Sequence, residues 1–114
     1  MAVRGSHRGV SSRALQEATG LLRVLAHPLR IRILERLTRS SSPLTVGELV
    51  HQLRQPQHTV SHHLNRMYLH DILARSRRGR EVFYRVRSRE ALKLLQWVQQ
   101  YRREEGWLMD GEAI

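Results

Sequence analysis

LTVGELVHQLRQPQHTVSHHLN, residues 44–65, carries the clearest structural pattern in the chain. Thr45 and Glu48 have the spacing of a capping box, in which the threonine side chain accepts a hydrogen bond near the glutamate and the glutamate reaches back. A short helix is expected behind this start, then a tight break at 54–56, then a second helix from 57 to 70. The short helix carries its apolar side chains at helical spacing: Val46, Leu49, Val50 and Leu53. Two short helices joined by a tight break, the second polar along one side, predict a helix-turn-helix.

The second helix of this pair has an apolar side and a polar side. Val60, Leu64 and Met67 are expected to face inward, with His63 beside them as a packed, hydrogen-bonded residue. In a helix-turn-helix the second helix enters the major groove of DNA, where its outward donors and acceptors can read base edges. The residues of this helix that we predict to contact DNA are Gln57, His58, Thr59, Ser61, His62 and Asn65.

A basic β-hairpin is expected after the helix pair. Residues 72–77 are a short strand candidate, 78–80 form a turn with a glycine available for positive φ, and 81–86 alternate like a second strand. Such a hairpin forms a wing, and arginines at its tip suit phosphates or a neighbouring minor groove. The residues that we predict to contact DNA from this hairpin, whose tip spans 77–81, are Arg75, Arg77, Arg78 and Arg80.

Amphipathic helices are expected on both sides of this unit. One helix starts near Arg13 and is closed by His27-Pro28, because the residue before a proline is pushed out of helical geometry. Another starts at Pro28 and ends in the serines before Pro43, and Ser88 can cap a last helix. The predicted fold is mainly α with a small β-hairpin: a winged helix-turn-helix of five helices and a two-stranded wing.

The charge of the chain is large and unevenly placed. The 114 residues suit one compact domain, and they carry a formal net charge of +10 with Lys93 as the only lysine. Residues 51–89 hold nine arginines against Asp71 and Glu81, a net charge of +7. This block predicts a polyanionic partner, with double-stranded DNA the leading candidate. We divide the chain into a flexible basic arm (1–12), a winged helix-turn-helix domain (13–103) and an acidic tail (104–114).

Several classes of protein are disfavoured by what the sequence lacks. It contains no cysteine, which excludes disulfides, cysteine–zinc sites and thiol redox sensing. It has no apolar run long enough to span a membrane and no apolar segment near its start, so a cytoplasmic location is expected by default. There is no glycine-rich phosphate loop or nucleophile elbow, and adjacent Ser61, His62 and His63 on one helix do not orient a triad, so an enzyme is not expected.

Four segments in register resemble ArsR/SmtB-type winged-helix repressors. LAHPLRIRIL (25–34) resembles the family's LA-D/H-P-x-R-x-x-I-L, LTVGEL (44–49) is similar to its LTVGEL segment, QHTVSHHL (57–64) resembles its recognition helix, and RGREVFYR (78–85) resembles its wing. The resemblance implies a homodimer that releases a palindromic operator when it senses an inducer. It also implies a dimer interface on the first and last helices, which we assign to Leu15, Ala18, Leu22, Leu92, Leu95, Val98 and Tyr101.

Two departures from the family pattern stand out. Asp71 takes the place of the usual glycine between the recognition helix and the strand, which predicts a corner that is strained or altered. His62 replaces a frequent arginine or lysine, which would make a DNA contact weaker or dependent on pH.

No cofactor is certain. The family's cysteine site would need thiols at Thr45 and Gly47, and residues 88–103 contain no histidine for its last-helix site. A site for Ni²⁺ or Zn²⁺ would have to use nitrogen and oxygen ligands. The candidate ligands are His7, His58, His62, Glu104 and Glu105, of which His58 and His62 are four residues apart on one helix face.

Two alternatives to a sequence-specific repressor therefore remain. One is a metal-responsive regulator that uses these ligands. The other is an architectural protein that binds nucleic acid through charge alone, with no sequence preference.

Overall fold

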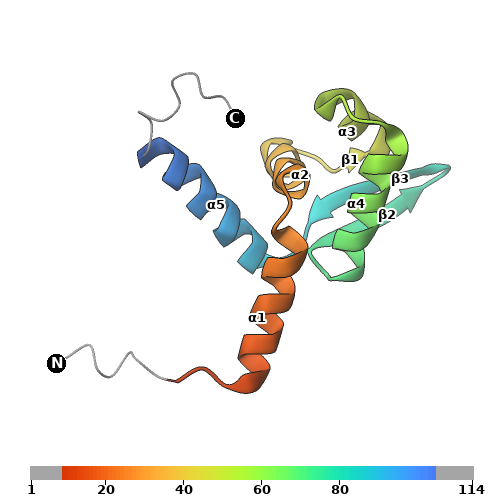
Figure 1. Ribbon diagram of the computed structural model, residues 1–114. Coiled ribbons are helices and arrows are strands. Elements are labelled where there is room, and N and C mark those ends of the chain that lie inside the picture. Colours follow the sequence, from red (N-terminus) through yellow and green to blue (C-terminus); the bar gives the residue numbers. More distant parts are fainter. Residues whose placement is uncertain (1–8, 105–114) are drawn as a thin grey trace.

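The computed structural model describes residues 9–104, with residues 102–104 described in their backbone alone. It contains five helices and three strands in this part of the chain (Figure 1). In order they are α1 (Ser12–Leu25), α2 (Pro28–Arg39), β1 (Leu44–Thr45), α3 (Val46–Leu53), α4 (Gln57–Leu69), β2 (Leu73–Arg78), β3 (Glu81–Val86) and α5 (Arg89–Glu104). α2, α3, α4 and the sheet form the body, and α1 and α5 extend from it on the side away from the hairpin tip.

Helices α2, α3 and α5 begin where the sequence offers a side-chain cap. Thr45 and Glu48 form the predicted capping box, because Glu48 N donates to Thr45 Oγ1 at 3.1 Å and Thr45 N donates to Glu48 Oε1 at 2.8 Å. α1 ends just before His27-Pro28, as the sequence predicts. His27 is the N-cap of α2, and its Nδ1 accepts from Leu29 N at the start of α2. Ser88 Oγ accepts from Ala91 N at the start of α5. Local hydrogen-bonding chemistry thus fixes three of the predicted helix starts.

The predicted two-stranded wing is confirmed as the hairpin of β2 and β3, and a third short strand, β1, which the sequence did not predict, completes the sheet. Its order is β1-β3-β2, and all pairs are antiparallel. Leu44 pairs with Tyr84 and Thr45 with Phe83, which attaches the start of α3 to the wing. β2 extends to Arg78, so the turn contains only Gly79 and Arg80. A strand of two residues has too little alternation to be recognised in a sequence.

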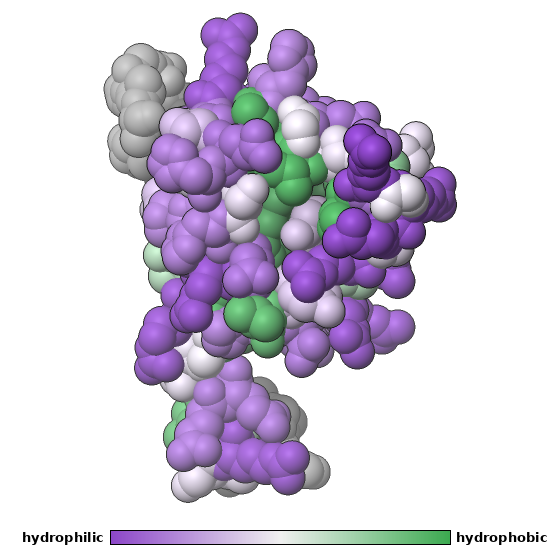
Figure 2. All heavy atoms as spheres, turned by 90° about the vertical axis from the view of Figure 1, so that its right-hand side faces the viewer, coloured by the Kyte–Doolittle hydropathy of each residue, from purple (hydrophilic) through white to green (hydrophobic). Residues whose placement is uncertain are grey.

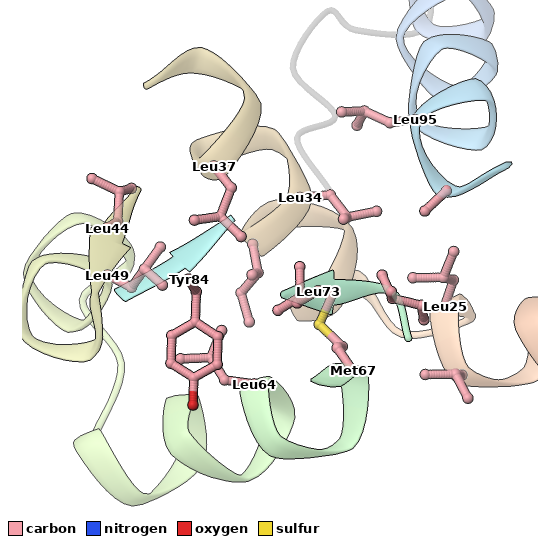
Figure 3. Packing of buried hydrophobic residues seen from close by; sticks show 14 of the residues in the cluster. Leu25, Leu34, Leu37, Leu44, Leu49, Leu64, Met67, Leu73, Tyr84 and Leu95 are labelled. Atoms are coloured by element: carbon pink, nitrogen blue, oxygen red, sulfur yellow. The ribbon is translucent and has the colours of Figure 1, made fainter. Parts of the chain in front are cut away.

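The core lies between α2, α4 and the sheet (Figure 3). α2 contacts each of the other four helices and β3, which makes it the centre of the body. Tyr84 of β3 points toward α4, beside Leu64 and Leu49. The side chains that are almost fully enclosed include Ile33, Leu34, Leu49, Val60, Leu64, Met67 and Leu73. Burial of each such side chain is worth roughly 1.5–3 kcal/mol, so α4 is held mainly by its apolar side.

The outer helices contribute unequally to this core. α1 buries only Val24 and Leu25, at its end nearest the body. α5 buries Ala91 and Leu95. Leu95 is 3% exposed, which corrects its assignment to a dimer surface, because it is enclosed by its own chain. None of the helices between residues 9 and 104 is both long and apolar enough to cross a membrane.

Candidate nucleic-acid interface

The break between α3 and α4 is a single left-handed residue followed by a proline. Arg54 has φ 55° and ψ 44°, and its N–H donates to Val50 O at 2.8 Å, which closes the end of α3. Pro56 then precedes α4. A non-glycine residue in the left-handed region costs about 1–2 kcal/mol, which the closed helix end and the packing of both helices must offset. This short connection fixes the angle between the two helices of the predicted helix-turn-helix.

The first turn of α4 is open toward solvent. Pro56 provides no side-chain cap, although its carbonyl accepts from Thr59 N and Val60 N. Gln57 and His58, at the first two helical positions, are exposed. Free N–H groups and the positive end of the helix dipole together favour an anion at such a terminus. A DNA phosphate fits this position.

α4 presents the predicted polar side chains on one surface. Gln57, His58, His62 and Asn65 are exposed, and Ser61 is half-buried among them. Their spacing gathers them on the side of the helix away from the core. Thr59 is half-buried at the border between the two sides. Figure 2 views the molecule from the hairpin side, where most of the face is hydrophilic and the apolar residues form a central strip and a few smaller patches.

The hairpin carries three exposed arginines at its tip. Gly79 has φ +62°, which side chains rarely adopt, so the two-residue turn requires this glycine. Arg77, Arg78 and Arg80 are all exposed, and Arg78 Cζ lies 5.4 Å from the centre of the Phe83 ring. These three guanidinium groups are available to phosphates or to a minor groove.

Arg75, at the base of the hairpin, has a different environment. Its Cζ lies 3.8 Å from the centre of the Tyr68 ring on α4, and it faces Tyr84 in the strand register. A side-chain hydrogen bond with Tyr84 is the main cause that raises the pKa of Arg75. The guanidinium therefore joins the wing to α4, a role that the sequence prediction of a DNA contact missed. The sequence contained a signal for this role, because Tyr68 and Tyr84 are aromatic residues that can pack against a guanidinium group.

His63 is the buried histidine that the sequence predicted. It is 6% exposed, and its Nδ1 accepts from Arg30 Nε at 2.9 Å. Burial, and then the neighbouring His27, Arg30 and His62, lower the pKa of His63 to about 4. The ring is therefore neutral at physiological pH.

The corner after α4 is strained as the departure from glycine predicted. Asp71 has φ 59°, and its Oδ1 accepts from Arg87 Nη1 at 3.4 Å. Both side chains are largely exposed, so the ion pair offsets little of the backbone cost.

Only two of the predicted metal ligands, His58 and His62, have side chains in the described part of the chain. His58 and His62 are both exposed on α4. Across the residues with described side chains, no group of three histidine, aspartate or glutamate side chains could hold a metal ion. His7, Glu105 and the side chain of Glu104 lie outside the described residues.

Known proteins share this arrangement. Residues 25–75 match a family described as a helix-turn-helix domain. The transcriptional repressor PagR of Bacillus anthracis is 34% identical over 89 residues, which cover 75% of this chain and 88% of PagR. The repressor SmtB of Mycobacterium tuberculosis is 43% identical over 75 residues, covering 65% of this chain but only 54% of SmtB.

Solved structures agree with the sequence relatives. The crystal structure of PagR superposes with a TM-score of 0.70 at 30% identity and covers 77% of this chain and 99% of PagR. AntR, an antimony-specific transcriptional repressor, superposes with a TM-score of 0.81 at 28% identity and covers 89% of this chain and 91% of AntR. The chain therefore belongs to the ArsR/SmtB family of winged helix-turn-helix, DNA-binding transcriptional regulators.

Proposed function

We propose that the protein is a homodimeric repressor that reads a palindromic operator with α4 and holds the DNA backbone with its wing. The observation that carries this proposal is the pairing of two surfaces. The polar side of α4 is exposed and does not pack against the core of the described chain. Three exposed arginines lie at the tip of the adjoining hairpin. One surface has the donors and acceptors that read base edges, and the other has the charge that binds phosphates.

Exposed apolar side chains on α1 and α5 support the dimer. Leu15 and Leu22 on α1 are about half exposed, and Trp97 and Tyr101 on α5 are 62% and 51% exposed. The two aromatic rings stack with their centres 5.5 Å apart. A large stacked aromatic pair in water is typical of an interface that a partner covers. Leu92 and Val98, also assigned to this surface, are half-buried, and Ala18 is exposed.

The space beside α1 is also large enough for a partner's side chains. A hollow of about 880 Å³ lies between α1, the corner after α4 and the start of α5. Ala18, Leu22 and Leu94 line its apolar side. A second copy seated against α1 and α5 would relate two α4 helices by a two-fold axis. The expected operator is therefore a palindrome with half-sites about 34–36 Å, or one helical turn, apart.

The test begins with the operator, which the chain itself can select. The full-length protein is incubated with a pool of duplexes that share a random central region, and bound duplexes are amplified and sequenced. The expected result is one palindromic consensus, bound at least about 10³-fold more tightly than its scrambled version. Equal binding of consensus and scrambled duplexes would overturn the proposal and leave an architectural, charge-driven binder.

A metal-responsive repressor is a second candidate, favoured by the likeness to AntR, which is described as antimony-specific. This chain has no cysteine, so any metal would take nitrogen and oxygen ligands. His58 and His62 could supply two of them, and a metal there would compete with DNA on α4. The check is operator affinity with chelator and then with Ni²⁺, Zn²⁺, Co²⁺ or Cu²⁺. An unchanged affinity with every metal would exclude this candidate and point to another inducer.

A further inference from the structure

A polar contact behind α4 joins three helices through one guanidinium group. Arg30, near the start of α2, donates from Nε to His63 Nδ1 of α4 at 2.9 Å. The same side chain donates from Nη1 to the carbonyl oxygen of Val24, at the end of α1, also at 2.9 Å. A single planar group therefore spans from α1 to α4, and both hydrogen bonds use its fixed fork geometry.

The chemistry of this contact leaves little freedom. A guanidinium has no acceptor, so Nδ1 of His63 must be unprotonated and the ring proton must lie on Nε2. Burial, and then the neighbouring His27, Arg30 and His62, keep the pKa of His63 near 4, so the ring remains an acceptor at neutral pH. Burial, and then the charge of Arg66, lowers the pKa of Arg30, but an arginine stays charged in proteins.

The junction between α1 and α2 covers the same contact. The His27 ring lies 4.4 Å from the His63 ring between centres, and His27 caps α2 through its Nδ1. His63 points away from the polar side of α4, because helical spacing places it opposite Asn65 and Ser61. The contact therefore takes no part in reading bases.

Apolar packing alone would locate α4 less sharply. Val60, Leu64 and Met67 hold the helix against the body, but hydrophobic contact is non-directional and tolerates small shifts. A charge-assisted hydrogen bond has a preferred length and angle. The Arg30–His63 contact adds this directional restraint. Because Arg30 also donates to the Val24 carbonyl, the restraint fixes the position of α4 relative to α1.

We infer that Arg30 and His63 are positioning residues that set the place of α4 relative to α1, and through α1 the distance between the two DNA-reading helices of a dimer. This inference rests on the proposed function, because it needs α4 to read DNA and α1 to lie in the dimer. Its consequence is specific. Loosening the contact should weaken the protein's preference for one half-site spacing, not its attraction to phosphates.

A matched pair of substitutions at one position tests this. His63→Asn keeps an acceptor near the Nδ1 position, whereas His63→Gln moves its polar atoms toward the Nε2 position. Arg30→Lys keeps the positive charge but removes the fork. Arg32→Lys is the control, because Arg32 lies on the same helix but is exposed and bonded to Glu35.

The measurement is affinity for the selected palindrome and for versions with one or two base pairs added between the half-sites. Wild-type protein, His63→Asn and Arg32→Lys should lose at least about tenfold with one added pair, equivalent to 1.4 kcal/mol. His63→Gln and Arg30→Lys should bind the original palindrome more weakly and distinguish the spacings by less than about threefold, with an unchanged salt dependence.

The outcomes distinguish a failure of the positioning role from a failure of the proposed function. If wild-type protein shows no sequence preference, the proposed function fails. If it prefers the palindrome and its original spacing, and folded His63→Gln and Arg30→Lys keep that spacing preference in full, the positioning role is wrong. A wild-type protein that reads the sequence but ignores spacing overturns the inference as well. Circular dichroism and thermal melting establish which variants fold, and Arg30→Lys decides the matter if His63→Gln does not.

Discussion

α4 and α1 are both amphipathic helices, yet the chain treats their apolar sides differently. α4 buries Val60, Leu64 and Met67 completely. α1 leaves Leu15 and Leu22 about half exposed and buries side chains only at its last turn. α4, which we propose reads DNA, is therefore fixed by the single chain, whereas α1 has an apolar side without a cover in the described chain. A binding helix needs an immobile support, and a dimer helix needs a free surface.

The same substitution in the two helices should sharpen this contrast most. Leu64→Ala removes a fully enclosed side chain and should lower the free energy of unfolding by about 2–5 kcal/mol. Leu22→Ala, at a side chain that is 50% exposed, should change the unfolding of the monomer by no more than about 0.5 kcal/mol. Urea denaturation at low protein concentration measures both. Equal losses would mean that α1 is as much a part of the monomer core as α4.

The proposed dimer surface on α1 and α5 can be tested at its stacked aromatic pair. Trp97→Ala removes the larger ring of the stack with Tyr101 and should weaken dimerisation by about 2 kcal/mol, or roughly thirtyfold. Analytical ultracentrifugation over a range of concentrations measures the dimer dissociation constant. Gln96→Ala, at the exposed neighbouring position on α5, is the control and should leave it unchanged. A dimer that tolerates Trp97→Ala must use another surface.

His63, on the buried side of α4, should make the stability of the folded protein depend on pH. His63 has a pKa of about 4 in the folded protein against about 6.5 when unfolded, and it faces His27 and Arg30, with His62 next to it. The unfolded chain therefore binds the extra proton first. Stability from the neutral ring is complete above about pH 6.5 and is lost as the pH falls toward 4, by up to about 1.4 kcal/mol per pH unit.

Comparison with His63→Asn isolates this contribution. Denaturation at a series of pH values should give a wild-type slope that exceeds the slope of the variant by close to one proton between pH 6 and 4.5. Parallel slopes would show that His63 does not titrate differently in the folded chain.

The smallest effect is expected at the wing tip. Arg80→Ala should reduce the magnitude of the slope of log K against log salt by about 0.9, the value for one phosphate contact. Arg13→Ala is the control, because Arg13 is an exposed arginine on α1 that is distant from the wing in the sequence. It should leave the slope unchanged. Binding to the selected palindrome at several salt concentrations measures both slopes. Identical slopes for the two variants would remove the wing tip from the phosphate contacts.

Much of the fold could be predicted because it depends on local chemistry. The capping box at Thr45, the proline after His27 and the serine before α5 mark helix starts within a few residues. Helical spacing also identifies which side of α4 is buried, including His63. These features need only neighbours in sequence, which a single sequence supplies.

The remainder depends on contacts between distant residues. β1 has two residues and is a strand only because β3 lies beside it. Leu95 continues the stripe of α5, and only the position of α2 makes it a core residue rather than a surface residue. In the sequence Arg75 cannot be distinguished from the other wing arginines, because its contact with the Tyr68 ring exists only in the folded chain.

The Arg30–His63 contact belongs to this second class, although it left a trace. Arg30 precedes Ile33 and Leu34 by three and four residues, so helical spacing places it on the buried side of α2. An arginine on a buried side requires acceptors, but the sequence does not name them. One of them is 33 residues away in α4.

We propose that the outer side of α4 reads bases while the wing holds the DNA backbone. The most direct test compares Ser61→Ala and Arg80→Ala by the ratio of affinities for the selected palindrome and its scrambled version. Ser61→Ala should lower this ratio by about tenfold, near 1–2 kcal/mol, with little change in binding to the scrambled duplex. Arg80→Ala should weaken both duplexes alike and keep the ratio. A ratio that falls with Arg80→Ala and is unchanged by Ser61→Ala would show that this division of roles between α4 and the wing is wrong.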